Sequence, residues 1–361
     1  MRIAILTNDF PSDDQLAQGL SWGAGRIAAI QVRLLKEAGH EVRIWHVPFS
    51  WGSKPGWDRF IAHIRDRKPR MDLVQEIVAW QPTTLITHNL TGCGFGTPRK
   101  VQEHGVRWIH ILHDVQLFEP SGQMVSAMNV TVWQLFWSWL RRHALGKPNM
   151  VLSPTGWLLR KHRRREFFLS DQISCEILPN PADFPRLSER RIHHPMRLLY
   201  VGRIAVDKGS TFLARLIERC SFPCEWHVVG EGPGVADLRR LGESVQFHGR
   251  LSEEEVKQMM DTSDVLLVPS LIEENQPTVI LEASSTGLPV IASDKGGIPE
   301  TMGRSGIICP PQHLDSWLRA IQDLQQEVTY KHISESMYAV ARLHDPENYR
   351  QRFLSLVTSN R

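Results

Sequence analysis

The sequence predicts an α/β protein built from two doubly wound domains. Its 361 residues exceed what one hydrophobic core usually serves, so two domains are expected. In the first half, short apolar runs of strand length alternate with stretches of helical periodicity, which is typical of a parallel sheet covered on both faces. The same alternation restarts near residue 197, after a segment rich in proline and basic residues.

The first domain is expected over residues 1–180. A helix is predicted where apolar residues recur at helical spacing until Gly39, and further helical stretches separate the strands. The predicted strands are the apolar runs at 2–8, 41–47, 83–89, 107–114 and 149–155. Because parallel strands end at the same edge of a sheet, ligands are expected at the loops that follow them and in a cleft between the domains.

A linker is expected over residues 181–196, since "LPNPADFPRL" and "ERRIHHP" combine prolines with basic residues. The second domain is expected over residues 197–344, and residues 345–361 are expected to form a C-terminal helix that returns toward the first domain. The predicted strands of the second domain lie at 197–202, 224–232, 244–250, 264–270, 288–293 and 306–309.

Composition excludes several classes of protein. No run approaches the ~20 apolar residues of a membrane-spanning helix, and "MRIAILTNDF" lacks the long apolar stretch of a secretion signal. The five cysteines show no paired metal-binding spacing, so we expect reduced thiols, including Cys220 and Cys224. These features predict a cytoplasmic protein without a cofactor or a bound metal.

The net charge of +3 is unevenly distributed. Residues 1–180 carry 22 Lys and Arg against 15 Asp and Glu, a net charge of +7, whereas the remainder carries 20 against 24, a net charge of −4. We therefore expect the first half to face an anionic partner. No DNA- or RNA-binding motif accompanies these charges, so nucleic acid is not the expected partner.

The clearest strand-loop-helix unit is "RLLYVGRIAVDKGSTFLARLIERC", at 197–220. Gly202 ends the strand, Arg203 follows it, and Lys208 precedes the next helix. Two cations beside a helix N-terminus suit a diphosphate. The alternative is that Arg203 and Lys208 are solvated surface charges. The spacing is not that of a P-loop.

Two glycine-rich stretches also follow strands. Gly230 and Gly232 of "VVGEGPG" are expected near a phosphate or a base, or simply in a turn. "WGAGRIA" fits the dinucleotide pattern G-x-G-x-x-A with Gly23 and Gly25. However, this loop begins too far after the first strand, and the second strand ends without an acid, so nicotinamide binding is not expected. The loop could still bind an anion.

The stretch "EENQPTVILE" places Glu274 and Glu282 eight residues apart around the start of a helix predicted at 278–287. Carboxylates accept hydrogen bonds from sugar hydroxyls, and N–H groups at a helix start donate hydrogen bonds to phosphate oxygens. The N–H groups expected to serve this role belong to Asn275, Gln276, Thr278 and Val279. The alternative is a solvated Glu274 and a Glu282 that caps its own helix.

Together these motifs resemble the retaining GT-B glycosyltransferases of the large "group 1" family. The resemblance covers nearly all of the second half and is patchier before it. The segments that carry it are "VGRIAVDKG", "VVGEGP", "VQFHGRLSEEEV", "SDVLLVPSLIEENQPTVILEASSTGLPVIASDKGGIPE" and "ILPNPAD", with the E-x7-E motif as the most specific part. The implied fold is GT-B, with two doubly wound Rossmann-like domains that face a deep interdomain cleft.

The resemblance implies roles for individual residues. Arg203 and Lys208 would hold the donor diphosphate, Glu282 the ribose hydroxyls and Glu274 the transferred sugar. The backbone of Arg250 and Leu251 would frame the base, "WGAGR" would lie near the donor phosphate, and His113 of "ILHD" would contact the sugar. The sequence departs from the family at Asn275 and Pro277, which replace glycines, and at Ala24, which splits a glycine pair.

The resemblance also implies the reaction. A sugar would pass from a nucleotide-diphosphate sugar to an acceptor hydroxyl with retention and without a metal, in polysaccharide or glycolipid assembly. The two cations would neutralise the leaving diphosphate, and the catalytic set would be His113, Glu274, Arg203 and Lys208. Two alternatives stay open: a GT-B-fold sugar-nucleotide epimerase and a non-catalytic sugar-nucleotide-binding protein.

Residues 132–165 combine aromatic and basic side chains, with no acid until Glu166. One interpretation is a helix whose apolar face packs on the first sheet, through Trp133, Phe136, Trp137 and Leu140. The other is peripheral contact with the anionic inner face of a membrane, which suits a lipid-linked acceptor. The basic residues in question are Arg160, Lys161, Arg163, Arg164 and Arg165.

Overall fold

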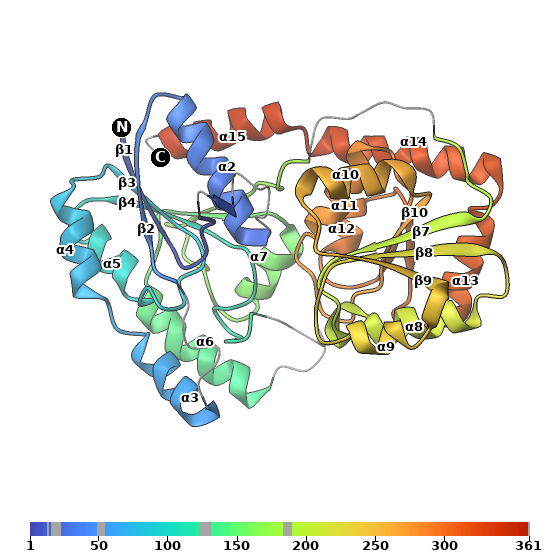
Figure 1. Ribbon diagram of the computed structural model, residues 1–361. Coiled ribbons are helices and arrows are strands. Elements are labelled where there is room, and N and C mark those ends of the chain that lie inside the picture. The colour runs from blue at the N-terminus through green and yellow to red at the C-terminus, as the bar shows by residue number, and fades with distance from the viewer. Residues whose placement is uncertain (13, 16–22, 49–54, 123–130, 183–189, 360–361) are drawn as a thin grey trace. The chain divides into compact units, whose positions relative to one another are not determined.

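The computed structural model describes residues 1–12, 14–15, 23–48, 55–122, 131–182 and 190–359 (Figure 1). They form two compact units. The first comprises the described residues up to 179 together with those from 350 onward, and the second comprises the described residues of 180–349. Residues 183–189 of the expected linker lie outside the described residues.

The first unit contains a sheet of six parallel strands in the order β2-β1-β3-β4-β5-β6. The strands are β1 (Arg2–Thr7), β2 (Glu41–His46), β3 (Thr84–Thr87), β4 (Arg107–Ile111), β5 (Met150–Ser153) and β6 (Ser174–Ile177). The first five lie where the sequence predicts them. The edge strand β6 was not predicted, because its sequence SCEI has a single large apolar residue. The strand order changes direction between β1 and β3, which is where α/β sheets commonly bind ligands.

Helices cover both faces of this sheet, as the two-sided burial of β1 requires: Ile3 and Ile5 on one face and Ala4 and Leu6 on the other are all inaccessible. The helices are α2 (Gly23–Glu37), α3 (Gly56–Arg65), α4 (Met71–Ala79), α5 (Thr97–Gln102), α6 (Val132–Leu145), α7 (Gly156–Arg163) and the C-terminal α15 (Pro346–Thr358). The end of α15 is fixed to the sheet by Arg107, whose guanidinium donates to the carbonyl oxygens of Leu356 and Val357 at 3.1 and 2.7 Å.

The second unit contains another six-stranded parallel sheet, in the order β12-β11-β10-β7-β8-β9. The strands are β7 (Met196–Val201), β8 (Cys224–Val229), β9 (Val245–Gly249), β10 (Val265–Val268), β11 (Val290–Ser293) and β12 (Ile307–Cys309). All six were predicted from their apolar runs. Counted from β7, this is the strand order of the dinucleotide-binding Rossmann fold, with the change of direction between β7 and β10.

Alternate residues of β7 enter separate cores on the two faces of this sheet. Leu198 joins the core under α8 and α13, whereas Leu199 joins the core under α10, α11 and α14. The helices are α8 (Ser210–Arg219), α9 (Val235–Arg239), α10 (Glu253–Thr262), α11 (Thr278–Ser285), α12 (Ile298–Met302), α13 (Leu314–Asp323) and α14 (Glu327–Leu343), as labelled in Figure 1. The unit is therefore doubly wound, as expected.

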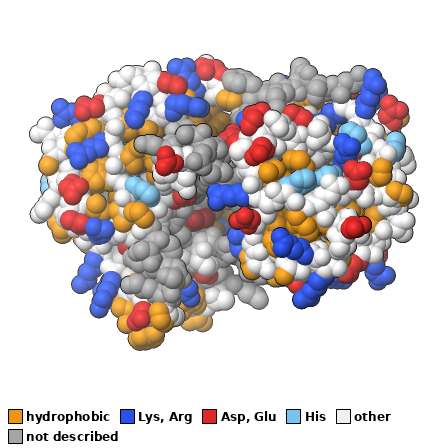
Figure 2. Space-filling model, viewed as in Figure 1, with side chains coloured by type: hydrophobic (Ala, Val, Ile, Leu, Met, Phe, Trp, Pro, Cys, Tyr) orange, Lys and Arg blue, Asp and Glu red, His pale blue; other side chains and the backbone are white. Residues whose placement is uncertain are grey.

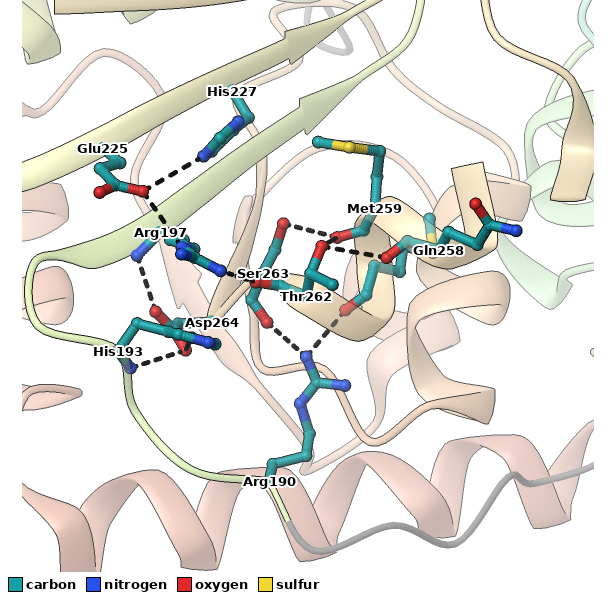
Figure 3. Close-up of polar contacts among 11 residues, drawn as sticks. Arg190, His193, Arg197, Glu225, His227, Gln258, Met259, Thr262, Ser263 and Asp264 are labelled. Atoms are coloured by element: carbon teal, nitrogen blue, oxygen red, sulfur yellow. Dashed lines mark hydrogen bonds and ion pairs between the residues drawn. The ribbon is translucent and has the colours of Figure 1, made fainter. Parts of the chain in front are cut away.

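A polar network fixes the segment that enters the second unit (Figure 3). The buried carboxylate of Asp264 accepts hydrogen bonds from His193 and from the backbone N–H of Arg197, at 2.9 and 2.7 Å. Arg190 donates to the carbonyl oxygens that end α10, and Arg197 pairs with Glu225 of β8 at 3.1 Å. These bonds lie at the amino ends of β7 and β10, so the opposite edge of the sheet is left to the loops that carry the candidate site.

Candidate functional site

The candidate site of the second unit lies where the strand order changes direction. The loop after β7 supplies Arg203 and Lys208, and the loop after β10 supplies Ser270, Glu273 and Glu274. In a parallel sheet both loops leave from the carboxyl edge, and neighbouring strands with crossovers in opposite directions leave space between them.

Close backbone packing brings these two loops together. Lys208 ends a 3₁₀ turn (Val206–Lys208), and the following Gly209 has φ +86°. A Cβ at Gly209 would lie 2.1 Å from the carbonyl oxygen of Pro269, so only glycine permits this approach. As a result Lys208 Nζ lies 2.5 Å from Glu274 Oε1, although the two residues are 66 positions apart. Two of the predicted site residues are therefore in direct contact.

The carboxylate of Glu274 is held from several sides. Its Oε1 also accepts from the hydroxyl of Ser270 at 2.7 Å, and its side chain is 13% exposed. Its backbone carbonyl accepts from the N–H of Gly297 at 2.7 Å, and a Cβ at Gly296 would lie 2.0 Å from the same oxygen. The glycine loop after β11 therefore supports the loop that carries Glu274.

Three contributors to this site were missed in the sequence analysis. Glu273 accepts from the N–H of Gly296 at 3.0 Å and lies 3.5 Å from Lys295 Nζ, so it ties the two loops together. Ser270 orients Glu274, and its position at the end of the strand predicted over 264–270 was the available signal. Tyr200 is buried and donates its hydroxyl to the carbonyl oxygen of Arg203 at 2.8 Å.

Arg203 pairs with the carboxylate of Asp207, one helical turn along the same loop. Its guanidinium is about half exposed, and Asp207 also accepts, through its carbonyl oxygen, the backbone N–H groups of Leu271 and Ile272. Both cations predicted to bind phosphate thus have a carboxylate partner in the structure. An anionic ligand that engages Arg203 and Lys208 has to compete with, or add to, these pairs.

The predicted glycines align the neighbouring loops. A Cβ at Gly230 would lie 1.9 Å from the carbonyl oxygen of Gly202, and one at Gly232 would lie 2.3 Å from that of Ile204. The N–H of Gly230 also donates to the carbonyl of Gly249 at 2.7 Å. The loops after β7, β8 and β9 are therefore packed backbone against backbone. The next two residues after Gly249 are the exposed Arg250 and the half-buried Leu251.

The helix of the E-x7-E stretch begins at Thr278, as predicted, and ends at Ser285, two residues earlier than predicted. Glu282 lies one turn inside α11 and is buried. The side chain of Gln276 is also buried and accepts from the N–H of Asn180 at 2.8 Å, so it fixes the start of the second unit. The remaining predicted contributors, Asn275, Thr278 and Val279, are half-buried.

In the first unit, His113 follows β4 and meets His88, which follows β3. Its Nε2 lies 2.8 Å from Nδ1 of His88, and the rings stack with their centroids 5.1 Å apart. Burial lowers the pKa of His113 to about 4, and it lowers the pKa of His88 as well. His113 is therefore neutral at pH 7, which suits hydrogen bonding to a hydroxyl.

The predicted glycine loop of the first unit contacts a carboxylate of the protein itself. Gly23 is the first residue of α2, with φ +61°, and the N–H of Gly25 donates to the carboxylate of Asp9 at 3.1 Å. Asp9 follows β1, and burial raises its pKa. The N–H that was expected to meet a phosphate therefore binds a side-chain carboxylate in the structure.

The aromatic and basic residues of 132–165 are partly buried and partly exposed, and the division differs from both interpretations of the sequence. Trp137 and Leu140 are buried as expected, but Trp133 and Phe136 are 48% and 36% exposed, so the prediction that they pack on the sheet is wrong. The expected membrane contact fails for two other residues: Lys161 and Arg165 are buried, over the rings of Trp157 and Phe118. Arg160, Arg163 and Arg164 are exposed. In the described ranges no helix has the length and apolar character to cross a bilayer.

Comparison with known proteins shows a family likeness for the second unit. Residues 195–327 match the family model of glycosyl transferases group 1, and this match lies within the second unit. Alpha-D-kanosaminyltransferase of Streptomyces kanamyceticus is 26% identical over 63% of this chain and 61% of its own length. The amylovoran biosynthesis glycosyltransferase AmsK of Erwinia amylovora is 31% identical over 36% of each chain. The chain thus spans less than two thirds of these relatives.

Solved structures extend the likeness beyond residues 195–327, as far as the fold is concerned. Sucrose-phosphate synthase from Thermosynechococcus elongatus superposes over 98% of both chains with a TM-score of 0.73 at 18% identity. Anabaena HepE, solved in complex with UDP-glucose, superposes over 99% of both chains with a TM-score of 0.71 at 14% identity. The fold is therefore GT-B, with two Rossmann-like domains, and the expected cleft between them stays a prediction.

Proposed function

We propose that the chain is a glycosyltransferase that moves a sugar from a nucleotide-diphosphate sugar to an acceptor hydroxyl, with retention of configuration. The observation that carries the proposal is the contact between Lys208 and Glu274 at the point where the second sheet changes direction. A cation for phosphate and a carboxylate for hydroxyls are adjacent there, as the junction between a diphosphate and a sugar requires.

In this proposal Lys208 and Arg203 bind the diphosphate and stabilise the charge that develops when the bond from the sugar to the diphosphate breaks. Glu274 binds hydroxyls of the transferred sugar, and the buried Glu282 binds the ribose. The neutral His113 contributes a hydrogen bond to the sugar. The acceptor hydroxyl loses its proton to an oxygen of the leaving diphosphate, so no protein nucleophile and no metal are needed.

The comparisons support sugar transfer as the reaction and a nucleotide sugar as the donor. One relative is named for kanosaminyl transfer and another for amylovoran biosynthesis, and a protein of the same fold was solved with UDP-glucose. We therefore place the chain in polysaccharide or glycolipid assembly and choose UDP-sugars as the first donors to test. A cytoplasmic location, with Arg160, Arg163 and Arg164 near an anionic membrane, belongs to the same proposal.

The decisive assay measures release of nucleoside diphosphate with and without candidate acceptors. We expect Lys208→Ala and Glu282→Ala each to lower kcat/KM for the donor at least about tenfold, or roughly 1.4 kcal/mol. Lys331→Ala, which removes an exposed lysine of α14, is the matched control and should act like the wild type. Wild-type turnover by both site variants would refute the assignment.

The same assay separates the alternatives. Release of nucleoside diphosphate that depends on an acceptor indicates transfer, release without any acceptor indicates an epimerase-type or hydrolytic reaction, and binding without release indicates a non-catalytic protein. A thermal-shift screen of UDP-, GDP- and ADP-sugars identifies the base, since a ligand at a hundred times its Kd stabilises the folded state by about 2.7 kcal/mol.

A further inference from the structure

Two helices of the first unit present apolar side chains to solvent. This aromatic surface consists of Trp57 and Phe60 of α3 and Val132, Trp133, Leu135, Phe136 and Trp139 of α6. Trp57 is 71% exposed, Val132 84% and Trp139 53%. Hydrophobic side chains gather accordingly at the lower tip of the molecule in Figure 2, where Figure 1 places α3. Soluble monomers rarely leave so many large apolar side chains together at the surface.

The aromatic surface is ordered. The ring of Phe60 stacks on Trp57 and on Trp133, with centroid distances of 5.3 and 5.5 Å, and Trp133 stacks on Phe136 at 6.1 Å. The fully buried Trp137 packs edge to face against the rings of Phe60, Trp133 and Phe136. The exposed rings are therefore held in place by the core of the unit.

The outward face of α6 is apolar, which is unusual for a helix at the surface of a soluble protein. Val132, Leu135 and Trp139 recur at spacings of three and four residues, so they lie on one face of the helix. Polar residues continue this face only at its end, with Arg142 and His143. The helix thus has a buried apolar face and an exposed one, and the exposed one has no protein partner among the described residues.

Basic side chains border the aromatic surface. The last residue of α3 and the segment that follows it form a basic run. It consists of Arg65, Arg67, Lys68 and Arg70, all of them exposed. Two acids lie beside this run. Asp72 pairs with Arg70, whereas Asp66 is buried, and its two oxygens accept from the N–H groups of Gly92 and Gly94 at 2.9 Å. The run therefore keeps a positive balance at the surface through Arg65, Arg67 and Lys68.

Part of the basic run lines a cavity beside α3. The cavity measures about 710 Å³, and Asp58, Ile61 and Arg65 of the helix line it together with Asp66, Lys68 and Arg70. The helix residues recur at spacings of three and four and lie next to the face that carries Trp57. One short helix therefore carries aromatic side chains on one face, and its adjacent face lines a cavity that has three basic residues and two acids.

We infer that the aromatic surface and the basic run dock the first unit on an anionic lipid bilayer. Tryptophan favours the boundary between headgroups and acyl chains, and a helix with an exposed apolar face lies in that plane. Each lysine or arginine near an anionic bilayer strengthens binding about fivefold. Together the two features match both chemical layers of a bilayer, the apolar boundary and the anionic headgroups. Docking of this kind deepens the membrane location given with the proposed function. It requires no sugar transfer, so its failure would leave the proposed activity untouched.

The test is flotation of the full chain with vesicles, either of phosphatidylcholine alone or of equal parts phosphatidylcholine and phosphatidylglycerol. We expect binding to the anionic vesicles that weakens with salt and is much weaker on phosphatidylcholine alone. The double variant Trp57→Ser/Trp139→Ser should bind at least tenfold more weakly. Its matched control is Val328→Ser/Leu343→Ser, which removes two exposed apolar side chains from α14 and should bind like the wild type.

A second pair of variants tests the charges. Arg65→Gln/Lys68→Gln should lower vesicle binding by about fivefold for each charge removed, and Arg215→Gln/Arg319→Gln, which removes two exposed arginines of the second unit, should not. The inference is overturned if the wild type ignores anionic vesicles or if the tryptophan variant floats as well as its control. It is also overturned if sedimentation shows a dimer that the tryptophan substitutions dissociate, because the surface is then an interface between copies.

Discussion

Replacement of Gly230 by alanine tests the packing of the loops that carry the candidate site. The residue has φ +129°, which side chains rarely adopt, and its Cβ would lie 1.9 Å from the carbonyl oxygen of Gly202. A methyl group there requires the two backbones to separate by about 1 Å. Backbone strain costs about 1–3 kcal/mol and overpacking a similar amount, so we expect a loss of about 3–5 kcal/mol in local stability.

The assay is hydrogen exchange of peptides from β7 and β8, which reports the free energy of local opening. A loss of about 3 kcal/mol accelerates exchange roughly 100-fold. Gly242→Ala is the control, because Gly242 also has positive φ, at +63°, but its Cβ would meet nothing within 4 Å. In this control we expect local stability to fall by about 1–2 kcal/mol, from backbone strain alone. Equal acceleration in both variants would refute the claim that contact between the two glycine loops is what excludes a side chain.

Two further predictions concern charged groups. In a double-mutant cycle of Lys208→Met and Glu274→Gln, thermal unfolding should give a coupling free energy of about 1–3 kcal/mol, because the ion pair is largely buried; a coupling near zero would contradict the contact. Burial raises the pKa of Asp66 from 3.8 to about 6, so between these values the folded state binds more protons and stability falls as pH rises, by about 3 kcal/mol. Asp66→Asn should lack this slope, so the difference between the wild-type and variant curves of stability against pH should show it. An unchanged slope in the variant would assign it to other groups.

The sequence predicted the fold because its local signals agree with its tertiary structure. Strands buried on both faces must be continuous apolar runs, and eleven of the twelve strands were found on that basis. The exception, β6, is an edge strand whose residues are half-buried or exposed, so it needs no such run. The glycines were equally informative, since Gly209, Gly230 and Gly232 all allow a backbone approach that a side chain would block.

The contacts of the site residues could not be predicted, because they depend on distant parts of the chain. Nothing near Lys208 in the sequence indicates that it meets Glu274, and nothing near Gln276 indicates that its side chain binds Asn180. The exposed aromatic side chains were mispredicted for a related reason. Periodicity identifies an apolar face of a helix, but α6 has two such faces, and the sequence does not say which one is covered.

The ion pairs at the candidate site bear directly on how a donor would bind. Lys208 and Glu274 already hold each other at 2.5 Å, so their side chains are placed before any ligand arrives. A diphosphate offers Lys208 a stronger partner than a single carboxylate, and sugar hydroxyls offer Glu274 donors in place of the ammonium. If the donor binds as proposed, binding of its two halves is coupled, because each half replaces the partner that the other half removes. A free nucleoside diphosphate would then satisfy Lys208 but leave Glu274 with only Ser270, so the proposed mode of binding favours the intact sugar donor over the product.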